Sequence, residues 1–269
     1  LNVGQFSMEI STLSGSVLVG RQHHIFKYRD TVTENNGATS ANRDLEVISH
    51  IFSKAIEWGY IKNDQHPTRG LRIKNSVEPR DRYVTDEELK QALSVANPFL
   101  RCYIMLKGLL GLRKGDMLRL KREIVSSDYA KIAISKKSKP GKPTRYKYVS
   151  LTPELKEALL KILALRKDKS GDLLFITSDG KPYIDEKGFT TAFDSMWQRY
   201  MKKVVALGIE RFTEHDLRAK VASDSESDIE AQIHLDHESV STTKKIYRRK
   251  PEIKQPAKGF LKSNDTEDS

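Results

Sequence analysis

Residues 99–112 constrain the fold more than any other stretch, because their apolar side chains face almost every direction around a helix. Tyr103, Leu106 and Leu110 recur at helical spacing, and further apolar residues fill the faces between them. A helix that is hydrophobic all round is stable only when neighbouring elements cover it. We therefore expect this segment to form the buried centre of a domain.

Short segments after this helix carry the residues typical of β-strands. Residues 124–125, 131–135 and 146–151 alternate apolar and polar side chains or are rich in β-branched and aromatic residues. They predict a small antiparallel sheet, with a basic Pro-Gly turn at residues 136–142 between the last two strands. A further strand-like piece covers residues 173–176.

Helical signals dominate the rest of the chain. Apolar residues at helical spacing, several times preceded by a capping residue, predict helices at residues 15–32, 42–59, 85–93, 152–169 and 186–207. In the last of these, aromatic residues recur from Phe189 to Tyr200 and are interpreted as core residues. The predicted fold class is mainly α with a small antiparallel β-sheet.

The order of these elements predicts two domains. Residues 1–75 contain only helical signals and are expected to form a small helical domain. Residues 76–82 are charged, contain Pro79 and lack apolar periodicity, which indicates a linker. Residues 83–262 combine helices and strands in a second, α+β domain, and residues 263–269 are expected to be a disordered acidic tail.

The chain is strongly basic. It has 47 Lys and Arg residues against 36 Asp and Glu residues, which gives a formal net charge of +11 and a pI of about 9.5. An excess of this size favours a polyanionic partner, and nucleic acid is the commonest one. A protein that is basic without such a partner is the alternative that charge alone leaves open.

Cysteine and apolar content exclude several other classes. Cys102 is the only cysteine, so the chain forms no internal disulfide and no cysteine-rich zinc site. No apolar run approaches the roughly 18 residues of a membrane span. We expect a cytoplasmic, nucleoid-associated protein of a bacterial host. Because the first residue is Leu1 and not a methionine, we also expect a fragment that lacks an upstream domain.

Residues 211–250 gather side chains that suit chemistry on a phosphate group. His215 and Arg218 are three positions apart and share one face of a helix. A threonine two residues before His215 is the expected N-cap, and the positive end of a helix dipole attracts anions. His237 and Tyr247 follow, and a tyrosine hydroxyl beside a bound phosphate is a potential nucleophile. The pattern favours phosphoryl transfer to a tyrosine, with DNA as the donor.

Cutting a DNA phosphodiester without a metal ion requires a nucleophile and a means of stabilising negative charge. Tyr247 is the expected nucleophile. Arg218 and Arg113 are the expected cations, because a guanidinium binds two phosphate oxygens at once. Arg113 follows a buried helix on a glycine-bounded turn, which is a rigid place from which to aim a cation.

The reaction also requires a base and an acid. His215 is the expected base for the tyrosine proton, since the pKa of an imidazole lies near neutral pH. His237 is expected to donate a hydrogen bond to a phosphate oxygen. Lys139, in the basic turn, is expected to protonate the departing 5′ oxygen. No metal and no nucleotide cofactor are expected, because the phosphotyrosine stores the bond energy.

Five motifs carry a resemblance to a known family: GLRKGD around Arg113, SKPGK around Lys139, HDLR at 215–218, LDH at 235–237 and TTKKIYRRK around Tyr247. With these motifs the chain resembles the tyrosine recombinases of the phage integrase family, and residues 41–61 resemble that family's helical core-binding domain. The resemblance implies a catalytic set of Arg113, Lys139, His215, Arg218, His237 and Tyr247, with Asp116 steadying the active-site groups. It also implies a C-shaped clamp around double-stranded DNA, a monomer in solution, and strand exchange in a tetramer through a Holliday junction.

Three departures from the family pattern lie beside the expected active site. Asp236 occupies the position that is usually glycine in the family's L-G-H motif. The interval from His237 to Tyr247 is one residue longer than the family's, and the interval from Arg218 to His237 is a few residues shorter. The resemblance also implies that part of the segment after Tyr247 docks on a neighbouring subunit.

Basic side chains in both domains are expected to contact DNA, namely Arg43, Lys54, Lys136, Lys137, Lys142, Arg248 and Arg249. The expected function is site-specific recombination that integrates or excises a mobile element. Two alternatives stay open at this point. One is a DNA relaxer similar to type IB topoisomerases, which share the catalytic set, and the other is a decayed prophage protein that binds DNA without cutting it.

Overall fold

The computed structural model describes residues 22–78, 80–126, 129–135, 143–166 and 171–250. The chain divides into two compact units, Leu1–Pro79 and Arg80–Ser269, and each is described by itself. The boundary between the units falls within residues 76–82, the interval predicted to be a linker. The expected tail at residues 263–269 lies outside the described residues.

The first unit consists mainly of two packed helices that are separated by one glycine. Helix α2 (Gln22–Asn36) and helix α3 (Ala38–Glu57) are separated by Gly37, whose φ of 86° breaks the helix, and a 3₁₀ helix η1 (Asn63–Gln65) follows. Their facing sides and Ile73, which follows η1, share one apolar cluster, whose helical members are Ile25, Tyr28, Val32, Ala41, Leu45 and Ile48. Helix α3 starts at Ala38, directly after Gly37, which is four residues before the predicted position 42.

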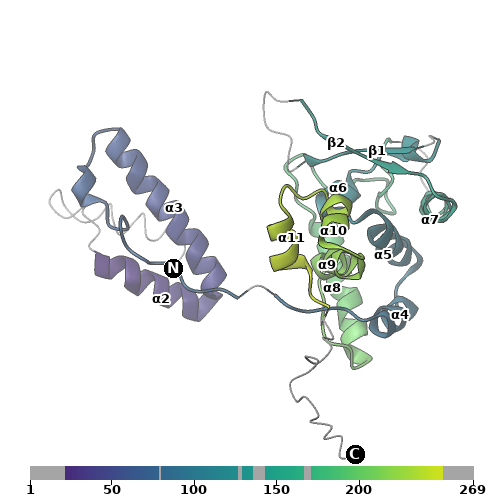
Figure 1. The fold of residues 1–269 in the computed structure, drawn as a ribbon, viewed down its shortest axis with the longest axis horizontal. Helices are drawn as coiled ribbons and strands as arrows, with labels where there is room; N and C mark the ends of the chain where they lie inside the picture. Colours follow the sequence, from purple (N-terminus) through teal and green to yellow (C-terminus); the bar gives the residue numbers. More distant parts are fainter. Residues whose placement is uncertain (1–21, 79, 127–128, 136–142, 167–170, 251–269) are drawn as a thin grey trace, which may run out of the picture. The chain divides into compact units, whose positions relative to one another are not determined.

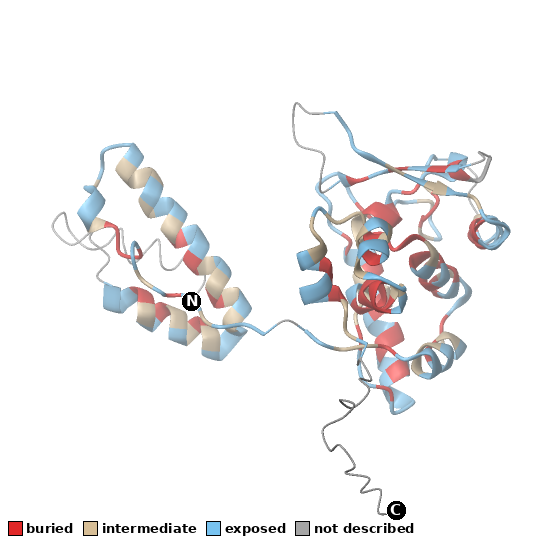
Figure 2. Cartoon of the chain, viewed as in Figure 1, coloured by how far each residue is buried: buried red, intermediate tan, exposed pale blue. Residues whose placement is uncertain are grey.

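Helix α5 lies at the centre of the second unit, as its sequence predicts. Its buried residues include Tyr103, Leu106 and Leu110, each with no exposed surface. Figure 2 shows buried residues concentrated on α5 and the helices around it. The helices of this unit are α4 (Asp86–Ser94), α5 (Pro98–Leu110), α6 (Lys114–Leu118), α7 (Pro153–Ala164), α8 (Thr191–Ala206), α9 (Glu214–Asp224), α10 (Asp228–Leu235) and α11 (Val240–Tyr247).

The sheet in the described part of the chain has two strands, β1 (Tyr129–Ala133) and β2 (Tyr146–Ser150). They pair antiparallel, with Lys131 opposite Tyr148. The mainly helical fold with a small antiparallel sheet confirms the predicted fold class. A strand at residues 124–125 was a wrong prediction, because these residues belong to the 3₁₀ helix η2 (Arg122–Ser126), which turns Ile124 into the core.

The region before α8 also differs from the prediction. Residues 173–176 make only isolated bridges, one of them between Lys121 and Leu173. Helix α8 begins at Thr191, five residues after the predicted start, because Gly188 adopts a φ of 90°. Phe189 consequently lies outside the helix and is 66 % exposed, whereas Phe193, Trp197 and Tyr200 are buried as predicted.

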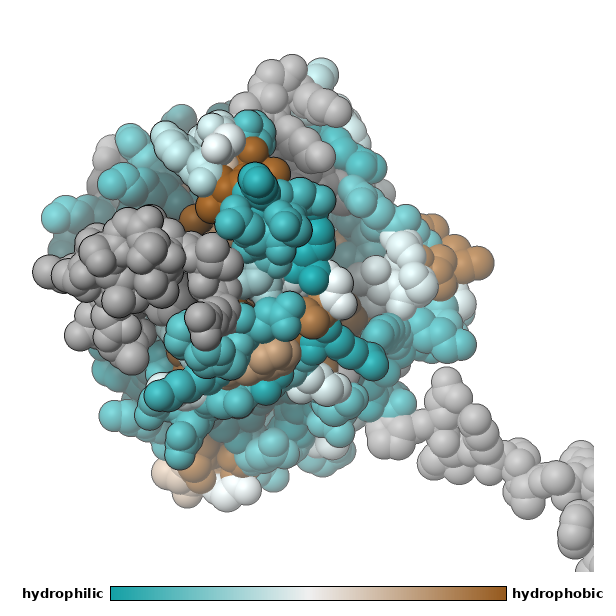
Figure 3. All heavy atoms as spheres, turned by 90° about the vertical axis from the view of Figure 1, so that its left-hand side faces the viewer, coloured by the Kyte–Doolittle hydropathy of each residue, from teal (hydrophilic) through white to brown (hydrophobic). Residues whose placement is uncertain are grey.

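The side drawn in Figure 3 is predominantly hydrophilic where its residues are coloured, with small and separate hydrophobic areas. Within the described ranges, no helix combines the length and the apolar character that crossing a bilayer requires.

Candidate active site

The first turn of α9 is fixed by a reciprocal cap. Thr213 Oγ1 accepts a hydrogen bond from the Asp216 backbone N–H at 3.2 Å, and Asp216 Oδ2 accepts one from the Thr213 N–H at 2.7 Å. This capping box satisfies two backbone donors that a helix start leaves free. Because the turn is fixed, His215 and Arg218 project from one face of α9, as their spacing predicts.

Arg218 is 1 % exposed and joins three elements. Its guanidinium donates to the carbonyl of Gly111, just after α5, and to the carbonyl of Leu235 in α10 at 2.6 Å. Its Nη2 lies 3.0 Å from His237 Nε2. Among the described residues the buried Nε of Arg218 has no hydrogen-bond partner.

His237 is held from both sides of its ring. Nε2 faces the Arg218 guanidinium, which has only donors, and Nδ1 lies 2.8 Å from Thr243 Oγ1 in α11. In this arrangement Nε2 accepts from Arg218 and Nδ1 donates to Thr243. A hydrogen bond from His237 Nε2 to a phosphate, as the sequence analysis expects, therefore requires Nε2 to gain a proton and to leave Arg218.

Tyr247, the last residue of α11, packs against the other three side chains. Its ring centroid lies 4.5 Å from that of His237 and 5.1 Å from that of His215, and the Arg218 Cζ is 5.7 Å from it. The tyrosine is 7 % exposed. Four residues predicted from separate motifs thus converge in one cluster, carried by α9, by α11 and by the segment between α10 and α11; these three helices lie side by side (Figure 1).

Arg113 stands at the N-cap of α6, two residues after Gly111, which adopts a left-handed φ of 59°. Burial lowers the pKa of Arg218, and the charge of Arg113 lowers it further, so the two guanidiniums lie within electrostatic range of each other. Asp116, in α6, is buried, and its Oδ1 accepts from the Ser135 N–H at 3.0 Å and from the Ser135 hydroxyl at 2.6 Å. Asp116 therefore fixes the chain immediately before residues 136–142.

The basic residues predicted to contact DNA fall into three groups. Lys136, Lys137, Lys139 and Lys142 lie outside the described residues. In the first unit, Arg43 is exposed on α3, and Lys54 makes an exposed ion pair with Glu57 at 2.7 Å.

Arg248 and Arg249 form the third group, and their side chains are directed into the protein. Arg248 Nη1 donates to the carbonyls of Ala222 at 2.9 Å and Ser225 at 2.6 Å. Arg249 Nη1 lies 2.5 Å from Asp216 Oδ1, and the Arg249 side chain is only 5 % exposed. These contacts hold the chain after Tyr247 against α9, whereas the sequence predicted that both arginines contact DNA.

The environment of His215 suits a proton acceptor. The residue is exposed, yet the atoms packed around its ring displace enough water to lower its pKa below the ordinary value. Glu214 opposes this shift, whereas the charges of Lys107, Arg218 and Arg249 add to it. A lowered pKa keeps the imidazole neutral near pH 7, and the neutral form is the one that accepts a proton.

Two lysines beside this cluster were not predicted. Lys107, in α5, is fully buried and contacts the carbonyl of Leu112 and the carboxylate of Glu214. Lys147, in β2, donates to the carbonyls of Leu110 at 2.9 Å and His234 at 2.5 Å, and burial lowers its pKa to about 8. A lysine within an otherwise apolar helix face is the signal that would have identified Lys107.

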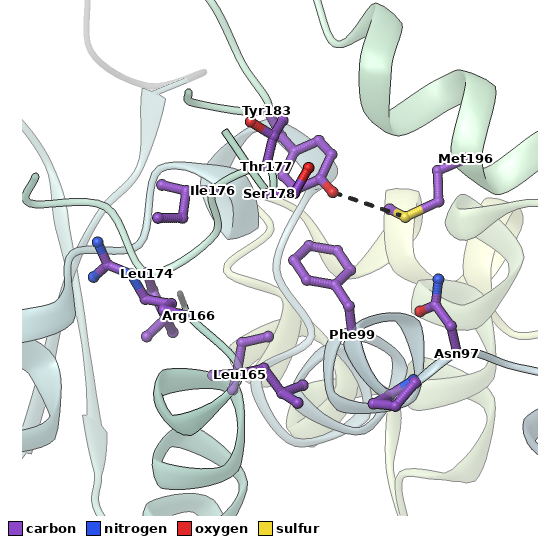
Figure 4. Close-up of a pocket in the computed structure, with 12 residues that line it drawn as sticks. Asn97, Phe99, Leu165, Arg166, Leu174, Ile176, Thr177, Ser178, Tyr183 and Met196 are labelled. Carbon is purple, nitrogen blue, oxygen red and sulfur yellow. Dashed lines mark hydrogen bonds between the residues drawn. The ribbon is translucent and has the colours of Figure 1, made fainter. Parts of the chain in front are cut away.

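A cavity of about 360 Å³ lies apart from this cluster, since none of its lining residues belongs to the cluster. Figure 4 shows Phe99 and Tyr183 on its wall, with ring centroids 4.9 Å apart. The Tyr183 hydroxyl contacts the Met196 sulfur at 3.9 Å, and Asn97, the N-cap of α5, also lines the cavity. The lining is mostly apolar and contributes to the core of the unit.

Solved structures of integrases share this fold. A lambda integrase described as a dimer bound to a COC′ core site superposes with a TM-score of 0.71 at 20 % identity, covering 95 % of this chain and 90 % of that one. An integrase of transposon Tn1549, in complex with circular intermediate DNA, superposes with a TM-score of 0.66 at 15 % identity, covering 89 % and 86 %. The chain therefore has an integrase fold.

A comparison of sequences identifies the family. Residues 82–252, more than half of the chain, match the sequence model of the phage integrase family. This chain belongs to the phage integrase family. It is also 28 % identical over 141 residues to the integrase of Escherichia phage P2, an alignment that covers 52 % of this chain and 38 % of that protein.

Proposed function

We propose that the protein is a site-specific DNA recombinase that integrates or excises a mobile element through a 3′-phosphotyrosyl intermediate. One observation carries the proposal. The Tyr247 ring, at the end of α11, lies against His215 and Arg218 of α9 and against His237, which lies between α10 and α11. A phenol beside a buried guanidinium and two imidazoles is an arrangement that suits attack on a bound phosphodiester. Membership of the phage integrase family supports the same reading.

In the proposed cleavage step, the Tyr247 oxygen attacks the phosphorus atom, and the bond from phosphorus to the 5′ oxygen breaks. The tyrosine proton passes to His215, whose lowered pKa keeps the ring neutral and ready to accept it. Arg218 and Arg113 bind the non-bridging oxygens, where negative charge develops. Asp116 supports this step by holding Ser135 and thereby the chain before residues 136–142.

The departing 5′ oxygen needs a proton, and we assign its delivery to Lys139. Reversal of the step, with a 5′ hydroxyl of another strand as the attacking group, releases Tyr247 and joins the strands. The phosphotyrosine keeps the energy of the broken bond, so the cycle requires neither a nucleotide cofactor nor a metal ion. With Nε2 unprotonated, His237 accepts a hydrogen bond from the Arg218 guanidinium. With Nε2 protonated, we propose that it donates a hydrogen bond to a phosphate oxygen.

The proposed substrate is double-stranded DNA with two recombination sites, and the proposed cellular location is the bacterial cytoplasm. We propose a monomer in solution that assembles into a tetramer on DNA. A lambda integrase tetramer has been solved on a Holliday junction, and its fold matches this chain with a TM-score of 0.64. The helical unit at residues 1–75, joined through residues 76–82 to the unit at residues 83–262, is proposed to complete a clamp around the duplex.

A nicked suicide duplex tests the proposal. After cleavage beside the nick, the short strand diffuses away, so a covalent protein–DNA adduct should accumulate and resist denaturing gel electrophoresis. Tyr247→Phe, which removes only the hydroxyl, should abolish the adduct while DNA binding persists. Absence of the adduct with the parent protein would contradict enzymatic cleavage. Recombinant products from a two-site plasmid, in addition to relaxed circles, would separate a recombinase from a DNA relaxer.

A further inference from the structure

The ammonium group of Lys107 bridges two segments that each precede a proposed catalytic residue. Its Nζ contacts the carbonyl of Leu112 and Oε1 of Glu214, and Lys107 has no exposed surface. Leu112 comes directly before Arg113, and Glu214 directly before His215. A single buried cation therefore contacts the backbone of the residue before Arg113 and the side chain of the residue before His215.

The turn that carries Arg113 is held by cations at three consecutive carbonyls. Lys147 binds the carbonyl of Leu110 at 2.9 Å, Arg218 binds that of Gly111, and Lys107 binds that of Leu112. The carbonyls at the end of a helix lack partners within the helix and carry partial negative charge, which favours cations there. The three cations come from β2, α9 and α5, so the position of the turn depends on all three elements.

Glu214 is itself fixed by a second contact. The Tyr103 hydroxyl donates to Glu214 Oε1 at 3.0 Å, and Tyr103 is fully buried in α5. The carboxylate is thus held by two residues of α5, one helical turn apart, while its own residue begins α9. This geometry fixes the start of α9 against α5.

We propose that Lys107 is a positioning residue that couples the turn before Arg113 to the first turn of α9, so that Arg113 and His215 are aimed at one phosphate. The inference rests on the proposed roles of Arg113 and His215. Lys107 is not a catalytic residue, because its ammonium is enclosed by Leu112 and Glu214 and reaches no surface.

Stability alone does not account for this arrangement. Removing two charges from water is costly, and apolar residues of similar volume often replace a buried ion pair with no loss of stability. Helix α5 is otherwise apolar where it is buried, so a methionine would suit position 107 by packing. What an apolar side chain does not supply is a fixed link between a carbonyl and a carboxylate.

The same pair acts on His215 through its charges. Glu214 raises the pKa of His215, whereas Lys107 lowers it together with Arg218 and Arg249, and the Tyr247 ring lies 5.1 Å away. If neutral His215 is the base, cleavage is lost as the pH falls through the pKa of His215. Loss of the Lys107 charge should therefore move the acid limb of the pH profile to higher pH, and loss of the Glu214 charge should move it to lower pH.

Single-turnover cleavage of the nicked suicide duplex, measured from pH 5 to pH 9, tests the proposal on the full chain. We expect Lys107→Met and Glu214→Gln to cleave roughly ten- to a hundred-fold more slowly than the parent, a range typical of lost positioning. Their acid limbs should shift in opposite directions, and their affinities for the intact duplex should stay within about two-fold, since neither side chain is placed to bind phosphate.

The exposed pair Lys161 and Glu157 of α7, with Nζ and Oε1 2.6 Å apart, provides the matched control. Lys161→Met and Glu157→Gln remove the same groups elsewhere in the unit and should leave the cleavage rate and its pH profile unchanged. Thermal unfolding of every variant, followed by circular dichroism, reports the folded fraction.

The double variant Lys107→Met/Glu214→Leu separates positioning from stability. It leaves no unpaired buried charge, so its melting temperature should recover toward that of the parent while cleavage stays slow. Recovery of cleavage along with stability, or parental rate and pH profile in folded Lys107→Met, would overturn the proposal. If Lys107→Met is unfolded, the cleavage rates and pH profiles of Glu214→Gln and of the double variant test the proposal instead. Failure of the parent protein to form an adduct would instead overturn the proposed function.

Discussion

Asp236 is the one described residue other than glycine with a positive φ, at 51°, and it caps the C-terminus of α10 in the left-handed region. The glycine usual at this position in the family therefore has a conformational explanation. A left-handed residue after a helix is most often glycine, and aspartate tolerates that conformation better than most other residues. Asp236 also opposes the lowering of the pKa of Lys147.

Substitutions at position 236 should rank by their tolerance of this backbone conformation. We expect Asp236→Gly to match or exceed the parent in free energy of unfolding. We expect Asp236→Ala to lose about 1 kcal/mol, because a Cβ is strained in the left-handed conformation and alanine has no polar side chain that could offset the strain with a local hydrogen bond. Urea denaturation followed by tryptophan fluorescence measures both differences. Equal stability of the alanine and glycine variants would show that backbone conformation does not govern this position.

Spacing within a motif predicted that His215 and Arg218 lie on one helix face, because that information is local. His215 and Arg218 share a helix face whatever lies around them, and Thr213 forms its cap within one turn. The apolar helix around Lys107 marks this lysine as unusual, but its carboxylate partner Glu214 lies 107 positions away in sequence. No local pattern encodes that contact, so the partner was recognised only from the structure.

At the scale of elements, the cap of α9 connects local stability to the proposed active site. Thr213→Ala removes the oxygen that accepts from the Asp216 N–H, and a lost N-cap typically costs about 1 kcal/mol. We expect this variant also to cleave more slowly, since the first turn of α9 carries His215. Chemical denaturation and the nicked-duplex assay measure the two effects.

A matched cap in the same unit gives the control. Thr85 forms a capping box with Glu88 at the start of α4, where its Oγ1 accepts from the Glu88 N–H at 3.2 Å. Thr85→Ala should lose a similar free energy of unfolding without a comparable loss of cleavage. If both variants lost cleavage equally, the effect would reflect general destabilisation and not the aim of His215.

The segment that ends α11 is the second element on which cleavage should depend. The Tyr247 carbonyl accepts from Ser223 Oγ at 2.8 Å, the same Oγ accepts from the Arg249 N–H at 2.7 Å, and the Arg249 side chain pairs with Asp216. Although the interval from His237 to Tyr247 is one residue longer than the family's, the chain at and directly after Tyr247 is therefore held against α9 by these contacts. Arg249 thus has a local role that differs from its predicted contact with DNA.

The salt dependence of DNA binding distinguishes these two roles of Arg249. Each phosphate contact adds about 0.9 to the slope of log affinity against log salt concentration. We expect Arg249→Ala to keep the parental slope while cleaving at least about ten-fold more slowly, an effect of lost positioning. Arg43→Ala, at an exposed position predicted to bind DNA, should reduce the slope by about 0.9. A reduced slope in Arg249→Ala would assign that arginine to phosphate binding.

Element boundaries were predictable where a strong local signal exists and not elsewhere. Such signals stand at Gly37, which two asparagines precede between α2 and α3, and at Pro98, which follows the N-cap Asn97 at the start of α5. The two apolar residues at 124–125 carried no such signal. Two adjacent β-forming residues are compatible with a strand and with a buried turn. Here the packing of Ile124 into the core favours the 3₁₀ helix.

At the scale of the whole molecule, the two units have separate apolar cores. The cluster around Ile25 and Leu45 belongs to the first unit, and the larger cluster around Tyr103 belongs to the second. Arg80, at the start of the second unit, has a side chain that is 47 % exposed, whereas the Arg82 side chain is 10 % exposed and paired with Glu88 at 2.7 Å. Trypsin should therefore distinguish these neighbouring arginines.

Limited trypsin digestion of the free protein should first cut between the units, near Lys74 or Arg80, and release two fragments that resist further digestion. Such cleavage is expected where few contacts cross a boundary and the chain is accessible. An excess of a duplex bearing the recombination site should slow this first cut, because a clamp that holds both units on one DNA restricts the segment between them. Mass spectrometry of the fragments locates the cut. An initial cut inside α5, α8 or α9 would contradict the division into two units, and an unchanged rate with bound DNA would contradict the clamp.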